Sequence, residues 1–123
     1  MIQGVVNAAY EPVITLTVLG PSGQSAEIEA VVDTGFNGFL TLPSESVATL
    51  ELLRLADGSV TLADGSTAMF DVYRTFVLWD GRPRRVDAHM SDSVPLVGMQ
   101  LLDRHSLFIE VEDGGRVLIQ AGG

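Results

Sequence analysis

The sequence predicts an all-β fold, a small sheet that closes or folds over on itself, with one or two short helices. Two observations lead to this prediction. Runs of strand composition recur along the chain, and between them lie short glycine turns, four of which contain an Asp-Gly pair, a strong hairpin signal. Hydrophobic residues make up 46% of the 123 residues and charged residues 19%, which is enough apolar material for a core. We expect residues 1–123 to form a single domain.

The first predicted element is a hairpin. Gly20-Pro21-Ser22-Gly23 has turn composition and separates two runs rich in β-branched and apolar residues, Pro12–Leu19 and Ser25–Val32. In the second run, apolar residues occupy alternate positions from Ala26 to Val32, and two of the positions between them are glutamates. This period of two predicts a strand with one face on the core and one face in water.

A short helix is predicted next, from Glu45 to about Leu50, with Ser44 as its N-terminal cap. Beyond it we expect turns at each Asp-Gly pair: Asp57-Gly58, Asp64-Gly65, Asp80-Gly81 and Asp113-Gly114. The pentapeptide Leu-Ala-Asp-Gly-Ser, present at Leu55–Ser59 and again at Leu62–Ser66, is interpreted as two successive turns.

The sequence of the last third of the chain predicts further short strands and one helical turn. Alternate apolar residues at Val86, Ala88 and Met90 indicate a strand with one wet face. A short helical turn is expected at Gly98–Asp103. The predicted final strands are Leu107–Val111 and the segment around Val117 and Ile119. Ile2–Val6 also has strand composition.

Composition excludes several functional classes. Sixteen acidic residues against seven arginines, with no lysine, give a net charge of −9, which disfavours nucleic acid as a partner. Without cysteine there are no disulfides, thiol nucleophiles or cysteine-ligated zinc sites, and two histidines offer little for another metal. We expect no metal and no cofactor. We also expect no membrane segment and a cytoplasmic location, because neither a long apolar run nor a signal-like start is visible.

The segment with most chemical information is Val31-Val32-Asp33-Thr34-Gly35. A half-buried strand runs directly into an acid, a hydroxyl and a glycine. An aspartate at the end of an apolar strand lies at the edge of a low-dielectric region, where its proton affinity can be tuned. The plain alternative is an ordinary turn, since all three residue types are common in loops.

Taken with two other features, this motif resembles the retropepsin-like aspartic proteases, in particular their small single-domain prokaryotic members. The second feature is a hairpin tipped by Ala63-Asp64-Gly65-Ser66 and continuing through Phe70–Tyr73. The third is the apolar-apolar-glycine element Leu96-Val97-Gly98, which leads into the predicted helical turn and a final strand. The resemblance covers nearly the whole chain and implies a closed β-barrel with one lobe of an acid protease per chain.

The resemblance implies an aspartic endopeptidase. In such enzymes two carboxylates share one proton, so that one activates water while the other acts as an acid. This chain has one Asp-Thr-Gly, and the four Asp-Gly pairs lack the intervening threonine. The implied arrangement is a homodimer with Asp33 from each subunit, in which Thr34 holds its symmetry mate, Gly35 shapes the loop, and terminal strands of the two subunits interleave.

The resemblance also implies the residues that contact a peptide or protein substrate. These are the residues that follow the motif, the tip of the hairpin acting as a flap, and one residue of the apolar-apolar-glycine element. They are Phe36, Asn37, Gly38, Ala63, Asp64, Gly65, Ser66 and Val97.

Two departures from the family pattern are visible. Phe36 stands where a small residue is common. Asn37 and Met99 stand where retroviral members have an acid and an arginine that pair, and their joint replacement avoids an unpaired buried charge.

Two other functions remain open: a non-catalytic peptide-binding or dimerisation module with the same fold, and weak calcium binding at the Asp-Gly turns. We expect His89 and His105 to lie at the surface. The cluster Arg82-Pro83-Arg84-Arg85 is expected on a solvated hairpin edge, and Tyr73 and Trp79 are expected to pack on strands.

Overall fold

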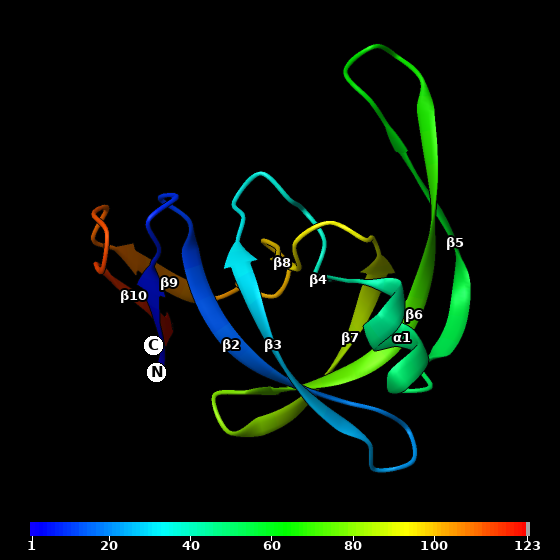
Figure 1. The fold of residues 1–123 in the computed structure, drawn as a ribbon, viewed down its shortest axis with the longest axis horizontal. Helices are drawn as coiled ribbons and strands as arrows, with labels where there is room; N and C mark the ends of the chain where they lie inside the picture. Colours follow the sequence, from blue (N-terminus) through cyan, green and yellow to red (C-terminus); the bar gives the residue numbers. More distant parts are fainter. Residues whose placement is uncertain (123) are drawn as a thin grey trace.

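The computed structural model describes residues 1–122, which form ten strands and one helix (Figure 1). In chain order the elements are β1 (Ile2–Val6), β2 (Pro12–Leu19), β3 (Ser25–Val32), β4 (Leu40–Leu42), α1 (Ser44–Thr49), β5 (Leu53–Thr61), β6 (Thr67–Trp79), β7 (Arg82–Met90), β8 (Leu96–Val97), β9 (His105–Ile109) and β10 (Arg116–Ala121). The predicted all-β fold is confirmed. Among the described residues, no helix is long and apolar enough to cross a membrane.

The strands form one sheet in the order β5-β6-β7-β4-β8-β3-β2-β1-β10-β9, and β6 also pairs with β2. This second pairing, of Val18 with Val77 and of Leu19 with Phe76, closes six of the strands into a ring. The core lies inside the ring, and its side chains come from nearly every strand. Leu40, Leu42, Val97 and Leu101, which are all fully buried, place the core directly beneath the segments that follow β3 and β8.

The predicted β2–β3 hairpin is confirmed with its predicted bounds, Pro12–Leu19 and Ser25–Val32. Seven residue pairs join the two strands, from Val13 with Val31 to Leu19 with Ser25. Along β3 burial increases toward the C-terminal end, where Ala30 and Val32 are buried. The strand therefore delivers its next residue, Asp33, at the boundary of the core.

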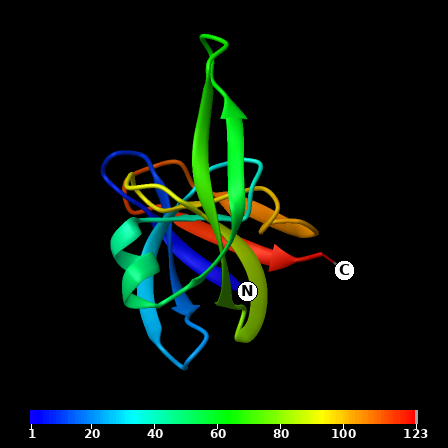
Figure 2. The same ribbon diagram turned by 90° about the vertical axis from the view of Figure 1, so that its right-hand side faces the viewer.

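The β5–β6 hairpin projects from the body of the molecule in both views (Figures 1 and 2). Its turn lies at Asp64-Gly65, as predicted, and Gly65 has a φ of +84°, a left-handed conformation that favours glycine. Asp80-Gly81 likewise joins β6 to β7 with positive φ at both residues, and the Asp113–Gly115 turn joins β9 to β10.

The turn predicted at Asp57-Gly58 is wrong. Both residues lie inside β5 and pair with Asp71 and Phe70 of β6. A Cβ at Gly58 would stand 2.2 Å from the Phe70 ring, so the glycine makes room for an aromatic side chain on the neighbouring strand and does not form a turn. Only the second copy of the repeated pentapeptide therefore contains a turn.

Two helix predictions need correction. Helix α1 exists, but Pro43 is its N-cap and Ser44 is its first residue. The amide and hydroxyl of Ser44 donate to Asp92 Oδ1 at 2.8 and 2.7 Å, so Asp92 of a distant loop supplies the acceptor. The predicted helical turn at Gly98–Asp103 is a series of hydrogen-bonded turns that is not a helix, and the following strand is His105–Ile109, two residues earlier than predicted.

The basic cluster also departs from prediction at one residue. Arg82 and Arg85 are exposed, as expected of a solvated hairpin edge. Arg84 is half-buried, and its guanidinium donates to the backbone carbonyl of Leu101 at 2.8 Å. Its position on the same strand face as Val86 and Ala88 explains the difference, because that face contacts the core.

The core beneath β4 gives a first testable prediction. Leu40→Ala leaves a cavity at a fully buried position, and we expect the free energy of unfolding to fall by about 2–5 kcal/mol. Urea denaturation followed by Trp79 fluorescence measures it. As a control, Leu62→Ala removes the same atoms from an exposed position and should change stability by less than about 0.5 kcal/mol. Equal losses in both variants would contradict this placement of the core.

Candidate active site

Asp33 is fixed to two strands at once. It directly follows β3, and its backbone amide donates to the carbonyl of Val97 at 2.9 Å, extending the parallel pairing of β3 with β8. β8 is in turn paired with β4 on its other edge, through Leu40 and Val97. The two chain segments on either side of the Asp33 loop are thus held together by one short strand between them. This arrangement limits where the aspartate backbone can move.

The carboxylate of Asp33 is oriented by its own loop. The Oδ1 atom accepts a hydrogen bond from the Gly35 amide at 2.8 Å. The backbone carbonyl of Asp33 accepts another from the Phe36 amide at 3.2 Å. Within residues 1–122, no protein donor bonds the second carboxylate oxygen, and Asp33 is half-buried. One oxygen is held while the other remains available to a water molecule or a partner. Thr34, beside it, is exposed.

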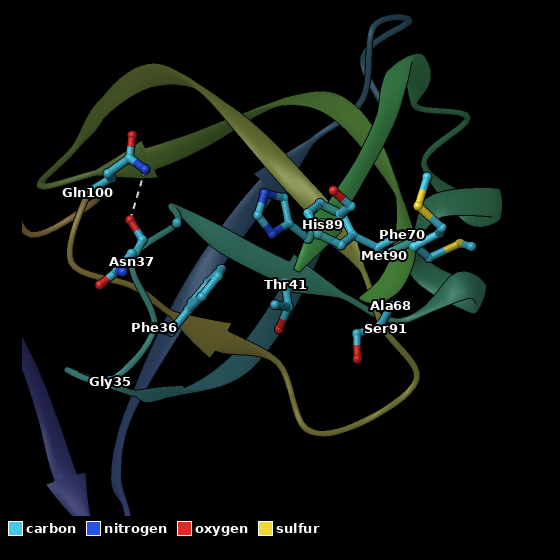
Figure 3. A pocket seen from close by; sticks show the side chains of 13 residues that line it. Gly35, Phe36, Asn37, Thr41, Ala68, Phe70, His89, Met90, Ser91 and Gln100 are labelled. Carbon is cyan, nitrogen blue, oxygen red and sulfur yellow. Dashed lines mark hydrogen bonds between the residues drawn. The ribbon is translucent and has the colours of Figure 1, made fainter. Parts of the chain in front are cut away.

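The loop after Asp33 is bound to the turns that follow β8. Met99 and Gln100 donate their amides to the carbonyls of Phe36 and Gly38, at 2.8 and 3.1 Å. The side-chain amide of Gln100 donates to the carbonyl of Asn37 at 2.8 Å (Figure 3). Three consecutive loop carbonyls are therefore satisfied by two neighbouring residues of the turn.

Two glycines permit this close contact. A Cβ at Gly98 would stand 2.1 Å from the carbonyl oxygen of Gly38 and 2.7 Å from the Phe36 ring. A Cβ at Gly38 would stand 2.6 Å from the same ring. Since real Cβ atoms do not approach so closely, a side chain at Gly98 would require the loop backbone to move, and one at Gly38 would require the Phe36 ring to shift. The glycine of the predicted Leu96-Val97-Gly98 element therefore has a steric basis.

An open pocket of about 610 Å³ lies beside this loop, between it, the β5–β6 hairpin and the end of β7. Most of its exposed lining is apolar, with some polar groups at the rim. The lining residues are Gly35, Phe36, Asn37, Gly38, Thr41, Ser59, Ala68, Met69, Phe70, His89, Met90, Ser91 and Gln100. Asp33 and Thr34 do not line this pocket; Asp33 is joined to its lining residue Gly35 by the hydrogen bond from the Gly35 amide to Oδ1.

Three rings form one wall of the pocket (Figure 3). His89 stacks on Phe70 with ring centres 4.3 Å apart, and it meets Phe36 edge-on at 5.5 Å. These residues come from β7, β6 and the Asp33 loop. Burial lowers the pKa of His89 below its ordinary value, and the nearby Asp87 carboxylate acts in the opposite direction. The wall therefore favours the neutral imidazole.

The structure brings only part of the predicted site together. Phe36, Asn37 and Gly38 line the pocket with Gly35. Ala63–Ser66 lie at the exposed tip of the hairpin and do not line it, and Val97 is fully buried beneath the loop. At the tip, the hydroxyl and amide of Ser66 donate to Asp64 Oδ1 and lower the pKa of Asp64.

The pocket residues that β6 and β7 supply were not predicted from the sequence, and the largest of them are Met69, Phe70, His89 and Met90. Alternation along β7 indicates only that His89 lies on the face opposite Val86 and Ala88. Its contacts with Phe70 and Phe36 follow from the register of the sheet, which the sequence does not show. The prediction that both histidines lie at the surface is wrong. His89 is a half-buried pocket residue, and His105 is a half-buried acceptor for the Trp79 indole N–H at 3.1 Å.

The prediction that Trp79 packs on a strand is confirmed, since it is buried at the end of β6. Within residues 1–122, no group of three or more histidine, aspartate or glutamate side chains could hold a metal ion. One of the four Asp-Gly pairs on which the calcium hypothesis rests, Asp57-Gly58, is not a turn at all.

No protein-family model and no curated protein sequence matches this chain. Among solved structures, the chain is similar to EIAV protease complexed with the inhibitor HBY-793, at a TM-score of 0.58 and 15% identity, over 78% of this chain and 88% of that one. It is also similar to a retropepsin-like aspartic protease from Rickettsia conorii, at a TM-score of 0.55 and 19% identity, over 99% and 91%. The chain has the retropepsin fold.

The terminal strands of this retropepsin fold pair within one chain. β1 lies beside β10 over four residue pairs, from Ile2 with Ile119 to Val5 with Arg116, and β9 completes this end of the sheet. The strands that were expected to interleave between two subunits are therefore already neighbours in one.

The environment of His89 gives a prediction about pH. Because folding lowers its pKa, the unfolded chain binds the proton more readily, so stability should fall as pH drops below about 6.5. We expect an NMR titration to place the midpoint of His89 below 6.5. Denaturant unfolding of wild type and His89→Gln between pH 5 and 8 should show that the variant loses less stability on acidification. A His89 midpoint above 6.5, with identical pH profiles, would contradict the burial described here.

Proposed function

We propose that this protein is an aspartic endopeptidase that hydrolyses peptide bonds as a homodimer, with Asp33 of each chain forming the catalytic pair. The observation that supports it most is the place of the Asp-Thr-Gly motif within a retropepsin fold. Asp33 directly follows β3, whose last residues are at the core, and its amide is bonded to β8. Its carboxylate is held by the amide of Gly35, which lines the open pocket.

The chemistry requires a second carboxylate. Two aspartates about 3 Å apart cannot both ionise, so the pair holds one proton, and one member removes a proton from water while the other donates to the substrate carbonyl. This chain has a single Asp-Thr-Gly. A two-fold axis next to Asp33 supplies the second copy with the same geometry. The hydrogen bond from Gly35 would hold each carboxylate in its orientation.

The other motif residues have roles in the same arrangement. Thr34 is exposed next to Asp33, so its hydroxyl is accessible to the partner's copy of the loop. A Cβ at Gly35 would meet only Asp33 Oδ1 within 4 Å, at 3.2 Å, which leaves space for substrate on its other side. The reaction consumes water and needs no cofactor.

The substrate would be an extended peptide or protein segment lying between the Asp33 loop and the β5–β6 hairpin. An extended chain projects alternate side chains to opposite sides, and those on one side would enter the 610 Å³ pocket. The hairpin tip at Ala63–Ser66 would act as the flap and close over the bound chain. The exposed Met69, at 69% of its surface, would then be covered.

The alternative is a non-catalytic peptide-binding or dimerisation module. Phe36 is the residue that favours it, because a large ring follows the motif. In the structure this ring packs against Gly38, Gly98 and His89, and the pocket stays open beside it. A pocket wall that contains Phe36 is compatible with peptide binding, whether or not the peptide is hydrolysed. An activity measurement must therefore separate the two functions.

A peptide-library digest tests the proposal. Asp33→Asn keeps an oxygen that can accept the Gly35 hydrogen bond, so the fold should persist while cleavage at pH 4–6 falls by about 10²- to 10⁴-fold. Asp113→Asn makes the same charge change in a distant exposed turn and should cleave like wild type. Mass spectrometry of the products measures both. Undiminished cleavage by Asp33→Asn would rule out this mechanism, and binding of peptides without any Asp33-dependent cleavage would favour the binding module.

A further inference from the structure

Arg84 occupies a position in β7 where an apolar side chain would be expected. Alternation along the strand places it on the same face as Val86 and Ala88, which are 2% and 0% exposed. A charged group on such a face is costly unless polar or aromatic partners compensate for the lost water. The contacts of its guanidinium therefore indicate what it does there.

The partners of Arg84 are carbonyls and rings. Its Nη1 donates to the Leu101 carbonyl at 2.8 Å and its Nη2 to the Gln100 carbonyl at 3.3 Å. The guanidinium carbon lies 6.0 Å from the centre of the Phe39 ring and 5.9 Å from that of Trp79. None of the ion pairs among residues 1–122 involves Arg84. A planar group with several donors suits this set of partners better than an ammonium does.

The two carbonyls belong to the turn that holds the Asp33 loop. Gln100 accepts from Arg84 through its carbonyl and donates to Gly38 and Asn37 through its amide and its side chain. Phe39, under the guanidinium, is bonded to the same turn through the Gly98 amide at 3.0 Å. Arg84 thus contacts the turn from the core side, while the Asp33 loop contacts it from the pocket side.

We propose that Arg84 is a positioning residue for the active site, which fixes the turn at Gly98–Leu102 and through it the loop that carries Asp33. Its effect on catalysis rests on the proposed function, whereas its effect on the loop does not. The uncharged residues Asn37 and Met99 cannot form an ion pair between this loop and this turn. Arg84 supplies the stabilisation from a different strand.

Amide hydrogen exchange tests the structural half of the proposal. In Arg84→Ala, the Met99 and Gln100 amides should exchange at least about tenfold faster, while the amides of β2 keep their wild-type rates. Arg84→Lys retains the charge and stem but not the paired donors, so its rates should fall between those of Arg84→Ala and wild type. If Arg84→Ala does not fold, Arg84→Lys alone is compared with wild type. Arg85→Ala removes an equal charge from the exposed face of β7 and should match wild type.

Steady-state cleavage tests the catalytic half. A displaced Asp33 loop should lower kcat by about 10- to 100-fold in Arg84→Ala, with KM changing less than about threefold and with a smaller kcat loss in Arg84→Lys. Exchange rates equal to those of Arg85→Ala would overturn the proposal. Faster exchange with an unchanged kcat would overturn the positioning role. If Asp33→Asn cleaves as well as wild type, the proposed function fails instead, and exchange alone decides whether Arg84 holds the loop.

Discussion

The close contact between two backbone segments, the loop after Asp33 and the turn after β8, is the constraint on which the site depends. Gly98 and Gly38 allow the approach, and hydrogen bonds from Met99 and Gln100 hold it. Because most of these bonds join backbone groups, their geometry follows from the chain path and depends little on side-chain rotamers. These bonds also restrict the position of Asp33. A catalytic carboxylate needs a fixed position if it is to meet a second carboxylate at short distance.

Different residues pack against the two sides of this contact. On the pocket side, Phe36, Phe70 and His89 form a wall that joins the loop to the projecting hairpin. On the core side, Arg84 and the buried Leu101 hold the turn in place. The tip of the β5–β6 hairpin, Ala63–Ser66, is exposed and lies outside both sets of contacts. A fixed loop beneath a projecting hairpin would suit the proposed endopeptidase, in which the hairpin acts as a flap over an extended peptide.

Sequence patterns predicted the fold class and the β2–β3 hairpin well, because alternation and turn composition are local properties. They failed where a distant residue decides the local structure. Gly58 is in a strand because Phe70 lies across from it, and Ser44 is not a cap because Asp92 reaches the same helix end. The pocket residues of β6 and β7 were missed for the same reason, since only the register of the sheet brings His89 to the Asp33 loop.

The central claim is that two copies of Asp33 act together, and mixed dimers test it most directly. Wild-type and Asp33→Asn chains, mixed in varying ratio at constant total concentration and allowed to exchange subunits, should lose activity as the square of the wild-type fraction. An equal mixture would retain roughly one quarter of the wild-type rate, because only dimers with two aspartates hold the shared proton. Activity proportional to the wild-type fraction would mean that each chain works alone, which would contradict the account.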